Sequence, residues 1–229
     1  MKNIFNSLLN LFFPPMCVAC EKYLSDGEKF LCLNCLEKLP KTNFYKQADN
    51  SVEQLLAGRV PFIRIASHIY FEKGGMLQPI VHELKYKSNP DLGIWLGKLC
   101  GKDLQNTLFL KTIDYIVPVP LHPKRERKRG YNQSFLLSQG LSSQTGIPIN
   151  DQAIERIVNN KSQTSKSKTE RIENVSGIFS LKETAGLVGK HFLLVDDLLT
   201  TGATLEECAK TILQIPESKI SIFTLGCAK

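Results

Sequence analysis

The sequence predicts an α/β protein: a mostly parallel β-sheet with helices on both faces and a small cysteine-rich module at the N-terminus. Strand-like and helix-like segments alternate along most of the chain, which is typical of parallel sheets covered on both faces. One buried-strand pattern ends abruptly in two acidic residues and then changes to helical spacing. Two closely spaced Cys-x-x-Cys pairs predict the separate module. The 229 residues, of which 42% are hydrophobic, suffice for both parts.

The expected elements follow from the spacing of the apolar residues. Alternation or short β-branched runs predict strands, and apolar residues three and four apart predict helices. In chain order, we expect strands at 64–71, 115–119, 154–158, 178–181, 192–195 and 219–225, and helices at 76–85, 92–104, 134–141 and 205–213. We expect residues 1–42 to form the N-terminal helix and metal module, 43–58 a polar linker, and 59–229 the α/β domain.

The first apolar run, residues 4–13, has the spacing of a short amphipathic helix. A secretion signal is the alternative, but Asn6 and Asn10 interrupt the run and no small-residue cleavage site follows it. No segment has the length of a transmembrane helix. We therefore expect a cytoplasmic protein.

Four cysteines in two Cys-x-x-Cys pairs, Cys17 with Cys20 and Cys32 with Cys35, are separated by eleven residues. Each pair forms a tight turn that directs both sulfurs to one point, and four thiolates complete a tetrahedral, structural Zn²⁺ site. Disulfides are the alternative, which the absence of a signal peptide disfavours. Zinc would fold the first forty residues, which have few apolar groups of their own. The remaining cysteines have apolar neighbours and are expected to be core thiols: Cys100, Cys208 and Cys227.

The segment from Phe192 to Thr204 is the most informative part of the chain. Its apolar strand ends at Asp196 and Asp197, and a Thr-rich turn then precedes the helical pattern. The free N–H groups and the dipole of a helix N-terminus favour a phosphate, and Gly202 lets the backbone approach it closely. The carboxylates would repel a bare phosphate, so their expected partner is a neutral polyol a few Å away. The two requirements together describe a ribose 5-phosphate.

Two other interpretations of this segment were open. The acidic pair can form a turn while one Thr caps the helix. It can also be a metal-binding or phosphate-accepting pair at a strand end, as in receiver-type domains, but that leaves the Thr-rich turn without a role. The segment resembles the phosphoribosyl pyrophosphate (PRPP) signature of type I phosphoribosyltransferases.

The charge balance, +7 with a pI of about 9.0, favours anionic partners such as phosphates, nucleic acid or a membrane surface. Five cations follow the strand that ends near Pro120: Lys124, Arg125, Arg127, Lys128 and Arg129. Such a run is usually a solvated loop, but a strand end faces the ligand crevice of an α/β sheet, and Arg matches phosphate oxygens. Lys85 adds a further cation at the end of a predicted helix.

The stretch between Arg156 and Arg171 is polar and has no periodicity. It can be a disordered surface loop, or a mobile lid that brings cations over a pyrophosphate and excludes water. The sequence does not separate the two interpretations.

Taken together, these motifs resemble those of the ComF family of competence-associated, phosphoribosyltransferase-like proteins. The resemblance covers nearly the whole chain. Its motifs are the two cysteine pairs, Leu84-Lys85-Tyr86, Pro118-Val119-Pro120-Leu121-His122, Arg129-Gly130-Tyr131-Asn132-Gln133, Gln163, Arg171 with Asn174, and Val195 through Thr204. The resemblance implies the type I phosphoribosyltransferase fold, joined to an N-terminal four-cysteine zinc module.

The resemblance also implies roles for individual residues. Asp196 and Asp197 would hold the ribose 2′- and 3′-hydroxyls. The 5-phosphate would be held by Thr200, Thr201, Gly202, Ala203 and Thr204. The pyrophosphate would be held by Val119, Pro120, Arg125 and Arg129, with Lys85 as an added cation. Gln163, Lys166 and Arg171 would belong to the flexible loop, although the family pattern has an apolar residue where this chain has Lys166.

The implied chemistry is displacement of pyrophosphate from ribose C1, with Mg²⁺ held mainly by PRPP oxygens. No motif for recognising a nucleobase acceptor stands out. The resemblance further implies a role in natural transformation, with single-stranded DNA and proteins of the competence machinery as partners. Two classes therefore compete: a phosphoribosyl-transferring enzyme, and a non-catalytic PRPP-fold module that binds single-stranded DNA.

Overall fold

A computed structural model describes residues 14–87, 89–158 and 177–229. The expected N-terminal helix and the predicted flexible-loop residues Gln163, Lys166 and Arg171 lie outside these ranges. The elements within them are α2 (Leu33–Glu37), η1 (Phe44–Lys46), α3 (Ser51–Leu56), β1 (Ile65–Phe71), α4 (Leu77–Tyr86), α5 (Pro90–Leu104), β2 (Tyr115–Pro118), α6 (Pro123–Arg129), α7 (Gln133–Thr145), β3 (Ile154–Arg156), β4 (Phe179–Leu181), β5 (His191–Leu199), α9 (Ala203–Ile212) and β6 (Lys219–Ala228). No helix within them is long and apolar enough to cross a membrane.

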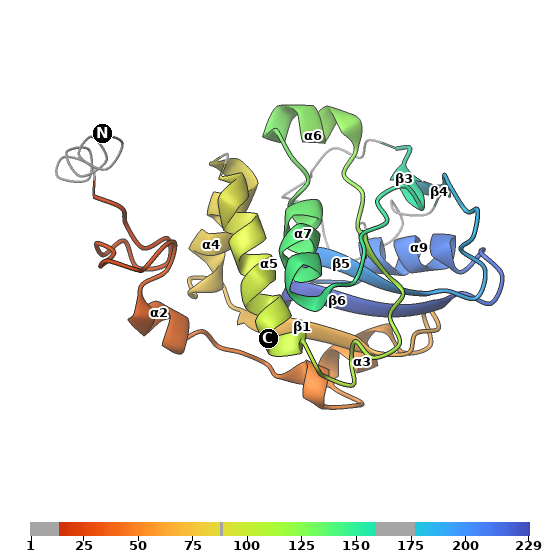
Figure 1. The fold of residues 1–229 in the computed structure, drawn as a ribbon, viewed down its shortest axis with the longest axis horizontal. Coiled ribbons are helices and arrows are strands. Elements are labelled where there is room, and N and C mark those ends of the chain that lie inside the picture. The colour runs from red at the N-terminus through yellow and green to blue at the C-terminus, as the bar shows by residue number, and fades with distance from the viewer. Residues whose placement is uncertain (1–13, 88, 159–176) are drawn as a thin grey trace.

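Four parallel strands form the central sheet in the order β1-β6-β5-β2 (Figure 1). β5 is a central strand, and its partners run in register from Phe192 beside Tyr115 to Val195 beside Pro118 on the β2 side. A separate antiparallel pair, β3–β4, lies outside this sheet and contacts α9 (Figure 1). Because all four sheet strands are parallel, their carboxyl ends share one edge, where α/β proteins bind ligands. The expected α/β class is confirmed.

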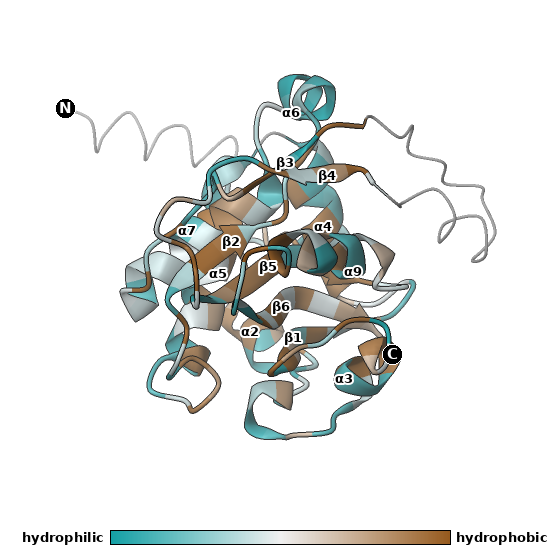
Figure 2. Ribbon diagram, turned by 90° about the vertical axis from the view of Figure 1, so that its right-hand side faces the viewer, coloured by the Kyte–Doolittle hydropathy of each residue, from teal (hydrophilic) through white to brown (hydrophobic). Residues whose placement is uncertain are grey.

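Helices cover the sheet on both sides (Figures 1 and 2). α5 and α7 pack closely together, and α7 contacts β2 and β5, while α9 contacts β5 and β6 from the other side. The α5–α7 contact depends on Gly97, where a Cβ atom would lie 2.1 Å from the carbonyl oxygen of Leu137. The interior is made of fully buried aliphatic and aromatic side chains such as Ile80, Leu96 and Phe192.

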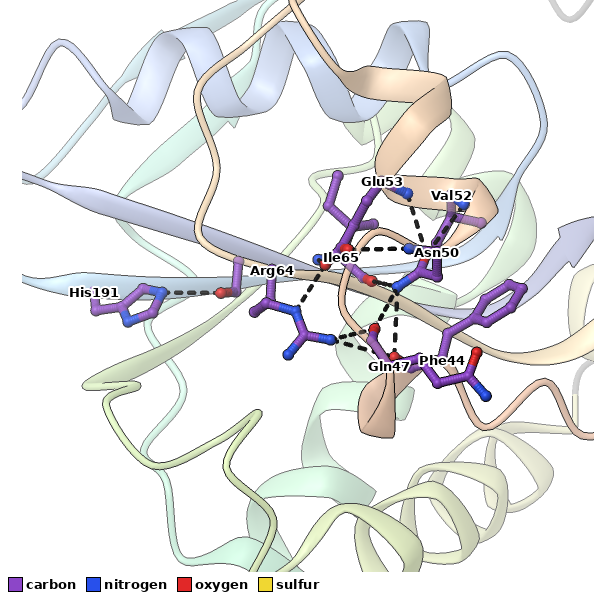
Figure 3. A network of polar contacts seen from close by, with 9 residues as sticks. Phe44, Gln47, Asn50, Val52, Glu53, Arg64, Ile65 and His191 are labelled. Carbon is purple, nitrogen blue, oxygen red and sulfur yellow. Dashed lines mark hydrogen bonds and ion pairs between the residues drawn. The ribbon is translucent and has the colours of Figure 1, made fainter.

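Within residues 43–58, which the sequence predicts as a polar linker, η1 and α3 form and pack against β1. Asn50 caps α3: its side chain accepts from the N–H groups of Val52 and Glu53 and donates to the Ile65 carbonyl oxygen at 3.0 Å. Glu53 in turn binds Arg64, with 2.8 Å between the charged atoms. Figure 3 shows how this network fastens α3 to the first strand.

Two further elements differ from expectation at the edge that matters for function. β5 extends past Val195 to Leu199, so Asp196 and Asp197 lie in a strand and not in a turn. The basic run forms α6 and not a loop, because Pro123 starts the helix at its first position and Gly130 ends it in the left-handed conformation. In Figure 2, α6 is a hydrophilic helix above the apolar sheet.

Candidate functional site

The acidic pair occupies the carboxyl end of β5, where the alternation of side chains sends its two members in different directions. One oxygen of Asp196 accepts from the Ser134 hydroxyl at 2.8 Å and from the backbone N–H of Asp197 at 2.9 Å. Asp197 is buried and pairs with Lys85 of α4, with 2.8 Å between Oδ2 and Nζ. Elements from three parts of the chain therefore orient the two carboxylates.

Burial makes Asp196 a weaker acid than an ordinary aspartate. Desolvation, and then the neighbouring charge of Asp197, raise the pKa of Asp196 to about 7, and the Ser134 hydrogen bond and Lys85 only partly offset this. A carboxyl group whose pKa is near 7 is a strong hydrogen-bond acceptor once it is ionised. A ligand that donates hydroxyl groups or brings a cation would stabilise this ionised form.

The turn after β5 forms a small hollow of about 40 Å³ at the N-terminus of α9, which we call the α9 cup; it is lined by Asp196, Leu198, Thr200, Thr201, Gly202, Ala203, Thr204 and Leu205. Gly202 has φ +76, and the helix begins directly after it. Gly202, the N-cap residue of this ten-residue helix, has no side chain to cap it, and of the first-turn N–H groups that of Ala203 donates to the Thr201 hydroxyl at 3.4 Å. The predicted Thr-rich turn and Asp196 of the acidic pair thus line one hollow, which suits an anion next to a polyol.

Arg59 supports the α9 cup from behind, and the sequence analysis did not identify it. Its guanidinium donates to the carbonyl oxygen of Thr201 at 2.8 Å and to Glu206 Oε2 from Nε at 2.8 Å. The nearby Leu56 leaves no space for a side chain at Gly202, where a Cβ would lie 2.6 Å from Leu56 Cδ2. α3 and the residues after it therefore fix the shape of a loop more than 140 positions later.

The chain between β2 and α7 forms the facing wall. The N–H of Val119 donates to the Val195 carbonyl oxygen at 2.9 Å, and Asn132 donates to the Val119 carbonyl oxygen at 3.0 Å, so this backbone is fixed next to the acidic pair. Pro120 follows at the half-buried rim. The sequence-predicted residues Val119 and Pro120 are thus beside the strand that carries Asp196.

Three half-buried arginines, Arg125, Arg129 and Arg156, form what we call the arginine cluster. Arg125 and Arg129 are one turn apart on α6, whereas Arg156 ends β3. Burial, and then repulsion by Arg129, lower the pKa of Arg125; burial, and then repulsion by Arg125, lower the pKa of Arg156. Within the described ranges, no carboxylate forms an ion pair with any of the three. Arg156 was missed because no motif marks it.

Two tyrosines near these cations differ in their availability. Tyr86 is 66% exposed, and the Arg129 guanidinium lies 5.7 Å from the centre of its ring. Tyr131 is half-buried; its hydroxyl donates to the Leu84 carbonyl oxygen at 2.9 Å and accepts from the Asn89 N–H at 3.2 Å. Tyr131 therefore holds α4 and α5 to the α6–α7 turn, and of the two only Tyr86 is exposed, with the His82 ring 5.1 Å from its own.

The four cysteines of the N-terminal pairs converge as predicted. The sulfur atoms of Cys17, Cys20, Cys32 and Cys35 all lie within 4.8 Å of one another, and none is in a disulfide. The Cys20 and Cys32 sulfurs are 3.8 Å apart, which equals the edge of a tetrahedron with metal–sulfur bonds of about 2.3 Å. Although burial opposes it, N–H groups led by that of Cys32 lower the pKa of Cys17 to about 7. The cluster can hold a metal ion.

No protein-family model matches the chain, but comparison with known proteins finds relatives. "Competence protein F" of Haemophilus influenzae is 35% identical over 131 residues, which cover 57% of each protein. "DNA utilization protein YhgH" of Escherichia coli is 27% identical over 213 residues, 92% of this chain and 89% of that protein. The chain thus spans just over half of the first relative and most of the second.

A solved structure of similar arrangement is the glutamine PRPP amidotransferase of Bacillus subtilis, complexed with ADP and GMP. It aligns with a TM-score of 0.42 and 18% identity, over 63% of this chain and 30% of that one.

Proposed function

Because this chain belongs to the ComF family of competence-associated proteins, we propose that it binds PRPP with Mg²⁺ and transfers the phosphoribosyl group to an acceptor, releasing pyrophosphate. The observation that carries the proposal is that Asp196 lines the same hollow as the N-terminus of α9, while Asp197, the next residue of β5, carries a second carboxylate beside it. Carboxylates accept from ribose hydroxyls, and the N-terminus of α9 binds the 5-phosphate. A ribose 5-phosphate supplies both the hydroxyls and the phosphate that these two parts require.

In the proposed reaction, Asp196 and Asp197 hold the 2′- and 3′-hydroxyls, and Thr200 to Thr204 hold the 5-phosphate. Val119, Pro120 and Lys85, with Arg125 and Arg129, face the pyrophosphate. The C1–O bond breaks and its electron pair leaves with the pyrophosphate, while a lone pair of the acceptor forms the new bond to C1. The oxygen donors of the acidic pair and of PRPP fit Mg²⁺, which when bound neutralises the leaving group. Lys85, now paired with Asp197, can shift to the pyrophosphate once the ribose occupies the pair.

Calorimetry with PRPP and Mg²⁺ tests binding, and a coupled assay of pyrophosphate release tests transfer. PRPP should bind to the wild-type protein and fail to bind when both carboxylates are removed. Pyrophosphate release only in the presence of an acceptor would support an enzyme. Binding of PRPP without any release, across purine and pyrimidine bases, would favour the alternative below.

The alternative is a non-catalytic module that binds PRPP and single-stranded DNA, and the outward face of α6 favours it. Lys124, Arg127 and Lys128 are exposed there, and Tyr86 offers a ring for stacking beside Arg129. Replacing these three cations by Gln should weaken binding of a labelled oligonucleotide at physiological salt. If PRPP also competes with the oligonucleotide, the arginine cluster serves both ligands; if it has no effect, the shared surface is excluded. Proteins of the competence machinery would be further partners of such a module.

We also propose that residues 1–42 form a module held by one structural Zn²⁺ on Cys17, Cys20, Cys32 and Cys35, and that residues 59–229 form the ligand-binding domain. Four thiolates at this spacing suit zinc and leave no open position for catalysis. Metal analysis should give one zinc per chain. Cys32→Ser should lose the zinc and destabilise the module, whereas Cys227→Ser, a buried thiol far from the cluster in sequence, should retain it. Unchanged zinc in Cys32→Ser would refute this assignment.

A further inference from the structure

A second cavity opens beside the acidic pair, between the end of β2, α6, the start of α7 and the β3–β4 pair. Its volume is about 350 Å³, within the range of small-molecule sites. Pro118, Pro120 and Phe135 give it an apolar lining. Pro118 is paired with Val195, the residue before Asp196, so the cavity adjoins the proposed ribose site.

Arg156 lines this cavity with most of its hydrogen-bonding capacity unused. Its Nε donates to the Val158 carbonyl oxygen at 3.3 Å, and its guanidinium lies 5.4 Å from the centre of the Phe179 ring. An arginine has five N–H donors, and the described part of the chain supplies no other partner for them. A half-buried guanidinium in this state favours an anionic ligand, which would offset both its burial and its repulsion by Arg125.

The other charged residues of the cavity limit how large that anion can be. Glu126, Asp151 and Glu155 are exposed, so their carboxylates form a negative rim around the deeper Arg156. Lys182 also lines the cavity, but its ammonium already binds Gln152 Oε1. A strand of phosphates would meet the rim, whereas a small molecule with one anionic group would pass it. The proline and phenyl lining fits the face of a planar ring.

We propose that this cavity takes the phosphoribosyl acceptor, and that Arg156 selects an acceptor whose planar ring carries a single carboxylate. The assignment of this cavity to an acceptor rests on the proposed function. The preference for an anionic ring does not, because it can be measured without PRPP. Arg156 is thus assigned to substrate specificity, apart from the residues that hold PRPP.

The test uses two aromatic acids, benzoate and pyridine-3-carboxylate, each with its uncharged amide. Calorimetry on the full zinc-loaded chain, with and without PRPP and Mg²⁺, should show at least one acid binding about tenfold or more tightly than its amide. Arg156→Gln should abolish this preference and Arg156→Lys should restore part of it. Lys219→Gln, which removes an exposed cation at the opposite end of the sheet, should leave the preference unchanged.

Three outcomes would overturn the inference. The first is that the acids and their amides bind equally, or that neither binds in the millimolar range. The second is that Arg156→Gln, folded by circular dichroism, keeps the preference. The third is that pyrophosphate or an oligonucleotide displaces the acid in the absence of PRPP, which would assign Arg156 to those anions. Failure of the wild-type chain to bind PRPP, with the acid preference intact, would refute the proposed function and leave this anion site standing.

Discussion

Two features of the proposed site, the α9 cup and the arginine cluster, are built in opposite ways. The cup comes from a single run of residues between a strand and a helix. The cluster joins side chains of α6 and β3, and Arg129 and Arg156 are 27 positions apart. A cup formed by one segment is shaped by local geometry, whereas a cluster of like charges forms only because the fold brings its members together. We expect the cup to respond sharply to shape and the cluster to respond to charge and salt.

The largest effect is expected from removing the acidic pair that borders the cup. Asp196→Ala with Asp197→Ala should weaken PRPP binding by about 2–4 kcal/mol, because two charge-assisted hydrogen bonds to the ribose are lost. The fold should survive, since Asp196 carries an unfavourable buried charge. Asp91→Ala, an exposed carboxylate outside both hollows, is the control and should bind PRPP normally. Normal PRPP binding by the double variant would show that the ribose assignment is wrong.

The next effect tests shape alone. Gly202→Ala places a Cβ 2.6 Å from Leu56 in a residue with φ +76, and should cost about 2–3 kcal/mol of stability. Gly146→Ala is the matched control: its φ is +75, but nothing lies within 4 Å of the added Cβ, so it should cost about 1 kcal/mol. Urea unfolding of both variants isolates the crowding. Equal losses would mean that α3 does not fix the cup.

Sequence patterns predicted most of the fold because burial repeats locally. Apart from α6, the strands and helices from β1 to β6 fall within a few residues of their predicted bounds, since the apolar spacing records which face is buried. The short helices within 43–58 were not predicted because their buried residues, such as Phe44 and Leu56, lie among polar neighbours. α6 was misjudged because a helix without a buried face has no apolar period.

The same distinction between local and distant contacts applies to the site. The cup and the cysteine cluster could be predicted, since each is a short motif with its own geometry. Arg59, Ser134 and Arg156 could not, because their partners Glu206, Asp196 and Arg125 lie between 31 and 147 positions away and nothing in the local sequence indicates them. Only folding creates those contacts.

The third prediction uses pH to isolate the contribution of Asp196, which lines the α9 cup. Because the pKa of Asp196 is raised to about 7, its ionised fraction grows about tenfold from pH 6 to pH 8, and PRPP affinity should rise with it. The stability of the free protein should instead fall as the pH rises. The raised pKa of Asp196 contributes stability that is fully present below the pKa of an ordinary aspartate and is lost as the pH rises through about 7. Calorimetry and melting at the two pH values measure both trends. Asp196→Asn should flatten them; a pH profile that Asp196→Asn leaves unchanged would contradict the assignment.

The smallest effect is expected from the arginine cluster, and salt dependence identifies it. Arg125→Gln or Arg129→Gln removes one of several cations facing the pyrophosphate, so PRPP affinity should fall only about two- to fivefold at low salt. The loss should shrink as salt screens the charges, whereas the loss of PRPP affinity from the acidic pair should persist. Lys128→Gln, on the outward face of the same helix, should change PRPP affinity little at any salt. If the Arg125 and Arg129 variants lose affinity independently of salt, these side chains make fitted hydrogen bonds to the ligand, and the cluster is as closely shaped as the cup.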